Sequence, residues 1–250
     1  IFADGVLEYP TQTAAISIPY KNTGKSGVLM FDPKKFTRFI TKADSAGLMV
    51  HVHAIGDRAV TETLNGFAEQ RKVNGQKLLP HSITHLQLVQ PRDFKRFRKL
   101  NILTAQQLLW AFGDVTTVDI VKPYIDEQLY KWQYPAKSML DAGVTIAGAS
   151  DWPVSSANPF EAIATAETRL GDLGVLNEKE RLPRINMFYG YTIEAARVIW
   201  LDSVTGSLET GKFADMILVD RDPFSVSAKD LAGTKVVWTM FKGKLVHGKL

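Results

Sequence analysis

The sequence predicts an α/β fold built around a parallel sheet. Several short apolar runs are bounded by glycine, proline or other turn residues, as buried parallel strands are. Segments with apolar residues at helical spacing separate these runs, so strand and helix alternate along most of the chain. This alternation predicts βαβ units, because parallel strands need crossover helices. After Thr192 the pattern changes to short β-prone runs punctuated by glycines, which predicts a smaller β region.

Five segments are predicted as strands of the parallel sheet. Ile1–Asp4 comes first and precedes a helical pattern. The other four begin close behind turn residues such as Gly47, Pro80 and Gly143. They are Leu48–Ile55, Ser82–Leu88, Ile102–Leu108 and Val144–Ala149. With their helices these strands make about five βα units.

Helices are predicted between the strands at Pro33–Gly47, Arg58–Lys72 and Pro91–Leu100. In the first helix, Phe36, Phe39, Ile40 and Ala43 are spaced for burial on one face. In the third helix, Lys and Arg residues fall between the members of an apolar stripe. A solvated outer face explains this basic cluster better than a docking patch for anions does.

The C-terminal region is predicted to be all-β. A helix over Thr192–Leu201, with Thr192 as its N-cap, connects the parallel sheet to this region. The β-prone runs that follow are Met216–Val219, Val236–Phe241 and Leu245–Val246. Between the last two, Lys242–Lys244 predicts a tight hairpin turn, with Gly243 supplying a positive φ.

Composition excludes several classes of protein. The 250 residues are 45% apolar and 22% charged, with a net charge of +4 and no cysteine. These values are typical of a globular domain and exclude a disulfide scaffold. No apolar run approaches the ~20 residues of a membrane helix, and the scattered basic residues do not indicate nucleic-acid binding. The absence of cysteine leaves the compartment open, and we favour the cytoplasm over export.

Histidine and aspartate residues at predicted strand ends indicate a metal site. His51 and His53 are two residues apart on one predicted strand, so their side chains point to the same side. His85 lies near the end of the next strand, and Asp151 follows the Val144–Ala149 strand. The spacings suit βα units of about 33 residues, so His53, His85 and Asp151 would meet at one edge of the sheet. His81, at the amino end of its strand, is interpreted as structural.

Three ligands without cysteine are typical of a catalytic metal rather than a structural one. Asp151 is the candidate general base, because a carboxylate beside a metal-bound water can accept its proton. A turn or N-cap role is the alternative for Asp151, since Ser-Asp-Trp-Pro is favourable turn chemistry.

Three motifs carry a resemblance to a known family. They are His53–Val60, Thr84–Gln87 and Gly148–Val154, and the tail segments Tyr191–Ala196 and Gly206–Asp220 agree with them. Together they resemble the YtcJ-like branch of the metal-dependent amidohydrolase superfamily, which includes N-substituted formamide deformylases. The resemblance covers essentially the whole chain.

The resemblance implies a distorted (β/α)8 barrel with a composite β-sandwich. His53, His85 and Asp151 would then be metal ligands, with His85 and Asp151 also catalytic. His51 would face the substrate or lie behind the metal ligands. Asp57 and Thr84 would contact the metal ligands without binding the metal themselves, although the family often has Glu at the position of Thr84.

The resemblance also implies that residues 1–202 are the C-terminal portion of the barrel and 203–250 a segment of the sandwich. A His-x-His pair and a carboxylated Lys of the family would precede Ile1, so the N-terminal half of the same enzyme is an expected partner. The metal would be zinc or a similar divalent ion, one or two per site. Self-association into a homo-oligomer is left open.

The expected activity is hydrolysis of a non-peptide C–N bond in a small amide or formamide. Trp110 and Trp152 would line a pocket for the leaving group, with ordinary packing as the alternative. A non-catalytic barrel that only binds or scaffolds remains an alternative function. Cyclic-amide hydrolysis or deamination, also found in this superfamily, is another.

Overall fold

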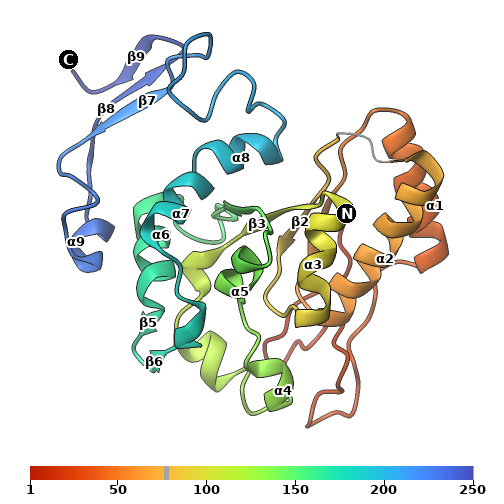
Figure 1. Ribbon diagram of the computed structural model, residues 1–250. Helices are drawn as coiled ribbons and strands as arrows, with labels where there is room; N and C mark the ends of the chain where they lie inside the picture. The colour runs from red at the N-terminus through yellow and green to blue at the C-terminus, as the bar shows by residue number, and fades with distance from the viewer. Residues whose placement is uncertain (76–78, 250) are drawn as a thin grey trace.

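The computed structural model describes residues 1–75 and 79–249. A four-stranded parallel sheet in the order β1-β2-β3-β4 forms the centre of the larger part (Figure 1). Its strands are β1 (His51–Ala54), β2 (Ser82–His85), β3 (Leu103–Gln106) and β4 (Ile146–Gly148). Each lies within a predicted strand and is shorter than it. The prediction of an α/β fold with a parallel sheet is therefore confirmed.

The register of the sheet separates two rows of side chains. Val52, Ile83, Thr104 and Ile146 are register partners and are all buried beneath the helices. The neighbouring row, on the opposite face, consists of His53, Thr84, Ala105 and Ala147. Successive side chains of a strand point to opposite faces, so the small and polar row is kept apart from the helix-covered row.

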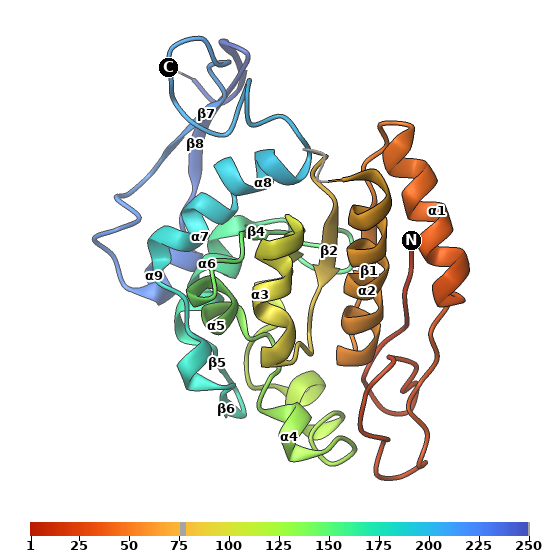
Figure 2. The ribbon, with the colours of Figure 1, turned by 45° about the vertical axis from the view of Figure 1, so that its right-hand side comes forward.

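Helices α1, α2, α3 and α5 follow one another along the helix-covered side of the sheet (Figure 2). Their bounds are α1 Pro33–Ser45, α2 Asp57–Asn74, α3 Pro91–Leu100 and α5 Ala136–Asp141. In α3 the apolar Phe94, Phe97 and Leu100 are buried, whereas Lys95 and the other basic residues face solvent or are half-buried. The structure thus agrees with a solvated outer face for the basic cluster.

The remaining elements connect or flank this sheet. Short helices are η1 (Leu108–Trp110), the π-helix η2 (Val115–Asp119), α4 (Glu127–Tyr130) and η3 (Glu178–Glu180). A small hairpin pairs β5 (Leu170–Gly171) with β6 (Gly174–Val175). The later helices are α6 (Pro159–Thr168), α7 (Arg184–Gly190) and α8 (Ile193–Val198), and α8 contacts β3 and β4.

The N-terminal segment lies beside β1. Ala3 donates its backbone N–H to the His53 carbonyl, and His53 donates to the Ile1 carbonyl, both at 2.8 Å. Only Phe2 forms a parallel bridge, so the predicted strand Ile1–Asp4 exists as an isolated bridge rather than a full strand. Residues after it cross to a second apolar cluster, in which Leu7, Ile16 and Tyr20 of this segment pack with Val121, Ile125 and Leu129.

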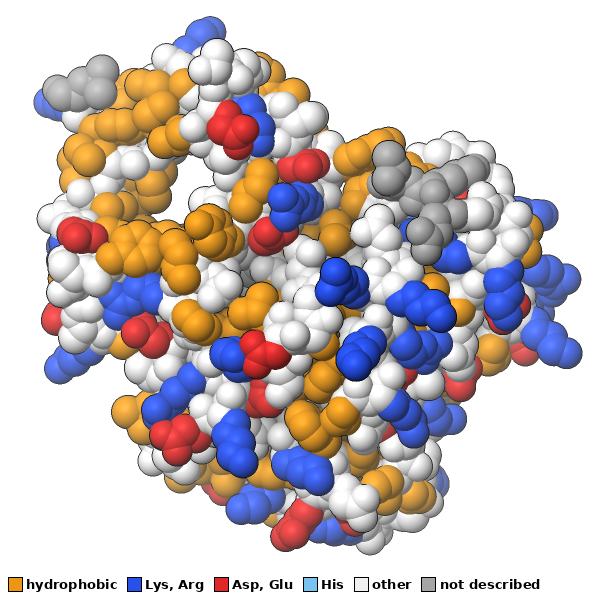
Figure 3. Space-filling model, viewed as in Figure 1, with side chains coloured by type: hydrophobic (Ala, Val, Ile, Leu, Met, Phe, Trp, Pro, Cys, Tyr) orange, Lys and Arg blue, Asp and Glu red, His pale blue; other side chains and the backbone are white. Residues whose placement is uncertain are grey.

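The C-terminal region contains an antiparallel sheet in the order β7-β8-β9. Its strands are β7 (Met216–Val219), β8 (Val236–Phe241) and β9 (Lys244–His247). The hairpin between β8 and β9 is confirmed, and φ is positive at both Lys242 (48°) and Gly243 (75°). Figure 3 shows apolar side chains gathered over this part of the surface. The exposed apolar residues include Ile217, Leu218, Val237, Phe241, Leu245 and Val246.

Two local predictions were wrong, and a third, the N-cap at Thr192, is confirmed in position but not in its hydrogen bond. The tail is not all-β, because α9 (Ala228–Ala232) forms behind Ser227, whose side chain accepts from the Asp230 N–H. Phe39 is 57% exposed, since α1 packs against α2 mainly through Phe36, Ile40 and Ala43. Thr192 occupies the N-cap position of α8, but its hydroxyl donates back to the Phe188 carbonyl and does not cap the helix.

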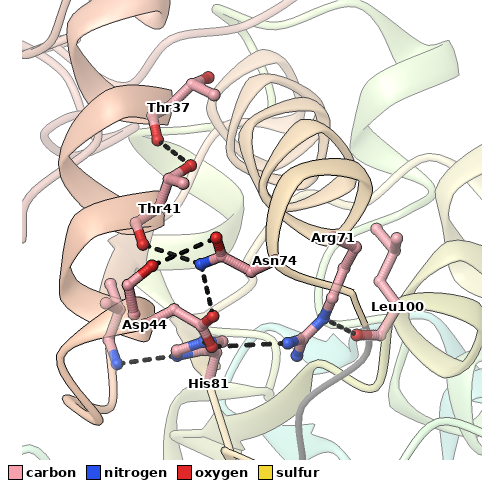
Figure 4. A network of polar contacts seen from close by, with 9 residues as sticks. Thr37, Thr41, Asp44, Arg71, Asn74, His81 and Leu100 are labelled. Carbon is pink, nitrogen blue, oxygen red and sulfur yellow. Dashed lines mark hydrogen bonds and ion pairs between the residues drawn. The ribbon is translucent and has the colours of Figure 1, made fainter.

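His81 has structural contacts and lies at the amino end of β2, away from the carboxyl ends of the strands (Figure 4). The Val50 N–H donates to His81 Nδ1 at 3.0 Å, so Nε2 carries the proton and donates to Asp44 at 3.0 Å. Asp44 also accepts from Asn74 and faces Arg71, whose Nε donates to the Leu100 carbonyl. This buried network joins α1, α2 and the start of β2.

Candidate metal site

His53 is held in one orientation by the N-terminal segment. Its Nε2 donates to the Gly5 carbonyl oxygen at 3.2 Å and lies 3.7 Å from a carboxylate oxygen of Asp4. Because a carbonyl can only accept, the proton of the neutral ring is on Nε2 and Nδ1 is free. Burial lowers the pKa of His53 by more than the Gly5 bond and the attraction of Asp151 raise it. His53 therefore offers a neutral ring nitrogen, the form that metals bind.

His85 reaches the same side through an unusual backbone. The register places Thr84 beside His53 and His85 beside Ala54, so regular alternation would point His85 toward the helices. Instead φ is 72° at His85 and 56° at Leu86, which ends the strand. The His85 ring lies edge-on to the His53 ring, with centroids 4.5 Å apart. Positive φ at non-glycine residues is costly and concentrates at functional sites.

His85 is buried, and one of its ring nitrogens has no hydrogen-bond partner. His85 is 7% exposed, and its Nδ1 is buried without a hydrogen-bond partner. Burial, with the nearby His53 and His51, lowers the pKa of His85 to about 3. The Trp110 ring stacks on the His85 ring at 5.8 Å, with only 9° between the planes. His85 is thus a neutral, sandwiched imidazole at the end of β2.

Asp151 is not brought into contact with this pair. It follows β4 with a φ of 55° and is exposed. Within residues 1–75 and 79–249, no three His, Cys, Asp or Glu side chains are grouped so that they could hold a metal ion. The structure therefore joins two of the three predicted ligands, and the full ligand set stays a prediction.

A cavity of about 310 Å³ opens on the face of the sheet that carries His53. Alanine and glycine residues of β3, β4 and the turn after β4 form its floor, and α8 covers it with apolar side chains. Asp151, His51 and Thr84 line it, whereas Trp152 is 71% exposed at the surface and does not. The complete lining is His51, Thr84, Ala105, Gln107, Ala147, Gly148, Ala149, Asp151, Ala195, Val198 and Ile199.

The remaining predicted site residues form hydrogen bonds with segments that are distant in the sequence. His51 pairs with the Ser82 hydroxyl at 2.7 Å. Thr84 donates to the Ala105 carbonyl at 3.0 Å. Asp57, at the start of α2, accepts from the backbone and hydroxyl of Ser17, so it holds the N-terminal segment against α2.

Sequence reasoning missed two residues, Asp4 and Gln107. The fully buried Asp4 carboxylate accepts backbone N–H groups of Ala15, Ile55 and Gly56 at 2.8–2.9 Å, and so fixes the turn after β1. Burial raises the pKa of Asp4 to about 6, against the lowering by these bonds. Gln107 follows β3 directly and is 3% exposed. Asp4 lies two residues after the bridge at Phe2, and Gln107 directly follows β3. A polar residue at the carboxyl end of a strand was also the signal that identified His85 and Asp151.

Among residues 1–75 and 79–249, no helix has the length and hydropathy needed to cross a membrane.

Comparison with curated proteins gives relatives of about twice the length. Over 98% of this chain, 31% of residues are identical to the protein LONG AFTER FAR-RED 3 of Arabidopsis thaliana, covering 42% of that protein. The putative amidohydrolase YtcJ of Bacillus subtilis is 28% identical over all of this chain and 46% of its own length. The N-substituted formamide deformylase of Arthrobacter pascens is 29% identical over 82% of this chain and 37% of its own. The chain spans less than half the length of these relatives.

Solved structures of metal-dependent hydrolases are also similar to most of this chain. An uncharacterized metal-dependent hydrolase from Pyrococcus furiosus matches 90% of this chain and 44% of its own, with 30% identity and a TM-score of 0.75. One from Pyrococcus horikoshii OT3 matches 91% and 45%, with 29% identity and a TM-score of 0.78. A sequence model of the amidohydrolase family matches residues 1–247. The chain belongs to the amidohydrolase family.

Proposed function

We propose that this chain provides part of the metal centre of a hydrolase that cleaves a non-peptide C–N bond in a small amide, such as an N-substituted formamide. The observation that carries the proposal is the His53–His85 pair at adjacent strand ends. The likeness to YtcJ, to N-substituted formamide deformylase and to metal-dependent hydrolases supports it.

The two histidines suit a divalent cation. His53 would bind through Nδ1, because Nε2 is used by Gly5, and burial keeps both rings neutral. Asp151 would be the third ligand from this chain. Imidazole and carboxylate together are a donor set that suits zinc. A bound cation of this kind polarises a carbonyl and lowers the pKa of water.

The protein side chains then have separate tasks in hydrolysis. Asp151 accepts the proton of the attacking water and passes it to the departing nitrogen. The carbonyl carbon gains the water oxygen and loses its bond to nitrogen, so the products are an acid and an amine. The Trp110 ring stacks on one face of the His85 ring. The apolar side chains of α8 that line the cavity would contact the group attached to nitrogen.

We also propose that residues 1–202 form the C-terminal portion of a (β/α)8 barrel and 203–250 a segment of a β-sandwich. Two features support this architecture. β4 stands at the edge of the parallel sheet, and the β7-β8-β9 sheet exposes apolar side chains. An N-terminal half of the same enzyme would cover both, and it would bring the further metal ligands that the family resemblance implies.

The metal content of the protein that contains this chain tests the proposal. The wild type, His53→Ala, His85→Ala and the control His247→Ala are purified with zinc, and bound metal is measured by mass spectrometry. His247 is an exposed residue of β9. We expect metal in the wild type and the control and a clear loss in the other two variants. Full retention in both His53→Ala and His85→Ala would contradict the assignment and favour a non-metal role for the pair.

A substrate panel then decides the chemistry. N-substituted formamides, simple amides, cyclic amides and aminopurines are compared by release of amine or ammonia. Turnover of formamides or open-chain amides that is lost in Asp151→Asn supports the proposal. Turnover of cyclic amides or aminopurines alone would replace it with cyclic-amide hydrolysis or deamination.

A further inference from the structure

Gln107 lies beside the His85 ring because of the register between β2 and β3. Thr84 is the register partner of Ala105, and Gln107 is two residues beyond Ala105, on the same face. The backbone turn at His85 brings its ring to that face as well. The Gln107 side chain, directly after the end of β3, is therefore a polar group on the same face as the His85 ring.

The hydrogen bonds of Thr84 fix which way the Gln107 amide points. Thr84 Oγ1 donates its only proton to the Ala105 carbonyl at 3.0 Å. The same oxygen must then accept from Gln107, whose Nε2 lies 3.1 Å away. With the amide nitrogen assigned in this way, Gln107 Oε1 is directed away from Thr84.

Two buried atoms in this place lack partners, and they are complementary. Gln107 Oε1 and His85 Nδ1 are both buried without a hydrogen bond. An unpaired buried polar atom costs about 1–3 kcal/mol, and an amide oxygen can only accept. Gln107 is also close enough to the ring to raise the pKa of His85, in opposition to the larger lowering by burial.

We propose that Gln107 is a positioning residue whose Oε1 accepts the Nδ1 proton of His85, so that Nε2 is left free to bind the metal ion. Thr84, Gln107 and His85 then form one chain of hydrogen bonds. Gly5 has the matching role for His53, with the opposite ring nitrogen left free. The inference rests on the proposed function, because it assigns the ligand atom of the same site.

A spectroscopic experiment on metal-free protein tests the contact directly. Long-range ¹H–¹⁵N correlations of ¹⁵N-histidine show which ring nitrogen carries the proton. We expect the Nδ1–H form for His85 in the wild type and in Gln107→Glu, which keeps an acceptor. We expect that preference to be lost in Gln107→Met. A wild-type His85 with its proton on Nε2 would overturn the proposal without any variant.

Zinc affinity, measured by competition with a chelator, is the second readout. Loss of such an outer partner weakens metal binding by about 10–100-fold, which we expect for Gln107→Met. Gln106→Met is the matched control, since Gln106 is the adjacent buried glutamine, also with an unpaired Oε1, but on the other face of β3. An equal loss in both variants, or none in Gln107→Met, would overturn the proposal.

The two readouts separate this inference from the proposed function. A wild type that binds no zinc would overturn the proposed function and the ligand role of His85. A wild type that binds zinc, with its His85 proton on Nε2, would overturn the role of Gln107 alone.

Discussion

Replacement of Asp44 by asparagine is expected to destabilise the fold strongly. Asp44 is the anion of the buried network between α1, α2 and the start of β2. It accepts from Asn74 Nδ2 at 2.7 Å and from His81 Nε2 at 3.0 Å, and it lies 3.7 Å from Arg71 Nη1. The substitution keeps the shape of the side chain but removes its charge and one of its acceptor atoms.

The size of the effect follows from these contacts. A hydrogen bond to a charged group contributes about 1.5–3 kcal/mol, and Asp44 accepts one from the buried His81 and one from the half-buried Asn74. The variant also removes the anion that the buried Arg71 faces. Removing one partner of a buried ion pair costs about 3–5 kcal/mol. We therefore expect the free energy of unfolding to fall by about 3–5 kcal/mol at pH 7.

The network also gives the pH dependence a definite sign. Burial raises the pKa of Asp44, but the bonds from Asn74 and His81 and the charge of Arg71 together lower it below 3.8. The unfolded chain then takes up the proton more readily, so this stabilisation is present above 3.8 and is lost as the pH falls through the folded pKa. Burial lowers the pKa of His81 below 6.5. Stability from His81 is likewise present above 6.5 and declines as the pH falls below it.

Urea unfolding followed by far-ultraviolet circular dichroism measures the effect, with Glu69→Gln as the control. Glu69 pairs with Lys72 on α2 at 2.6 Å, but both side chains are more than half exposed. An exposed pair of this kind contributes at most about 1 kcal/mol. If Asp44→Asn lost no more stability than Glu69→Gln, or if the difference from wild type did not shrink below pH 3.8, the reasoning about the network would be refuted.

Three further changes have expected outcomes. In Gly56→Ala the new Cβ would lie 2.1 Å from the Ala15 carbonyl oxygen. We expect this clash to lower the free energy of unfolding by about 1–3 kcal/mol. An unchanged midpoint of thermal unfolding would contradict this. Arg169→Met removes three hydrogen bonds that the buried guanidinium donates to the carbonyls of Gln133, Tyr134 and Leu176. At about 1 kcal/mol for each bond, about 3 kcal/mol should be lost, and amide exchange near Leu176 should accelerate. Gly243→Val forces a β-branched residue to a φ of 75°, and the β8–β9 hairpin should lose about 1–2 kcal/mol of protection against exchange while β1–β4 keep theirs.

Hydrophobic patterning predicted most of the larger elements, because the helices bury one face and the parallel strands are short apolar runs. The α3 boundaries and those of β7 and β8 agree with their predicted ranges. The parallel strands are shorter than their apolar runs, since pairing requires a neighbour in register while burial does not. Leu86, Leu88 and Val89 are fully buried although β2 ends at His85. An apolar run therefore marks the buried length of chain, and only the register shows how much of it is strand.

Local propensity was insufficient where tertiary contacts decide the outcome. Phe39 has the helical spacing of a buried residue, yet α1 packs against α2 through its other apolar positions. The short α9 depends on the Ser227 cap and on Leu231, which is buried against the main core. Neither the packing partner of α1 nor that of α9 can be inferred from the spacing of apolar residues within the helix itself.

The candidate site shows the same limit more sharply. Strand alternation correctly put His51 and His53 on one face, but the register alone would put His85 on the other. The left-handed backbone at His85 and Leu86 reverses that outcome, and no residue type at these positions signals it, because glycine is absent from both. In this conformation His85 Nδ1 is also buried without a hydrogen-bond partner. The proximity of Gln107 to His85 therefore could not be predicted from the sequence, because it depends on the register of β2 and β3.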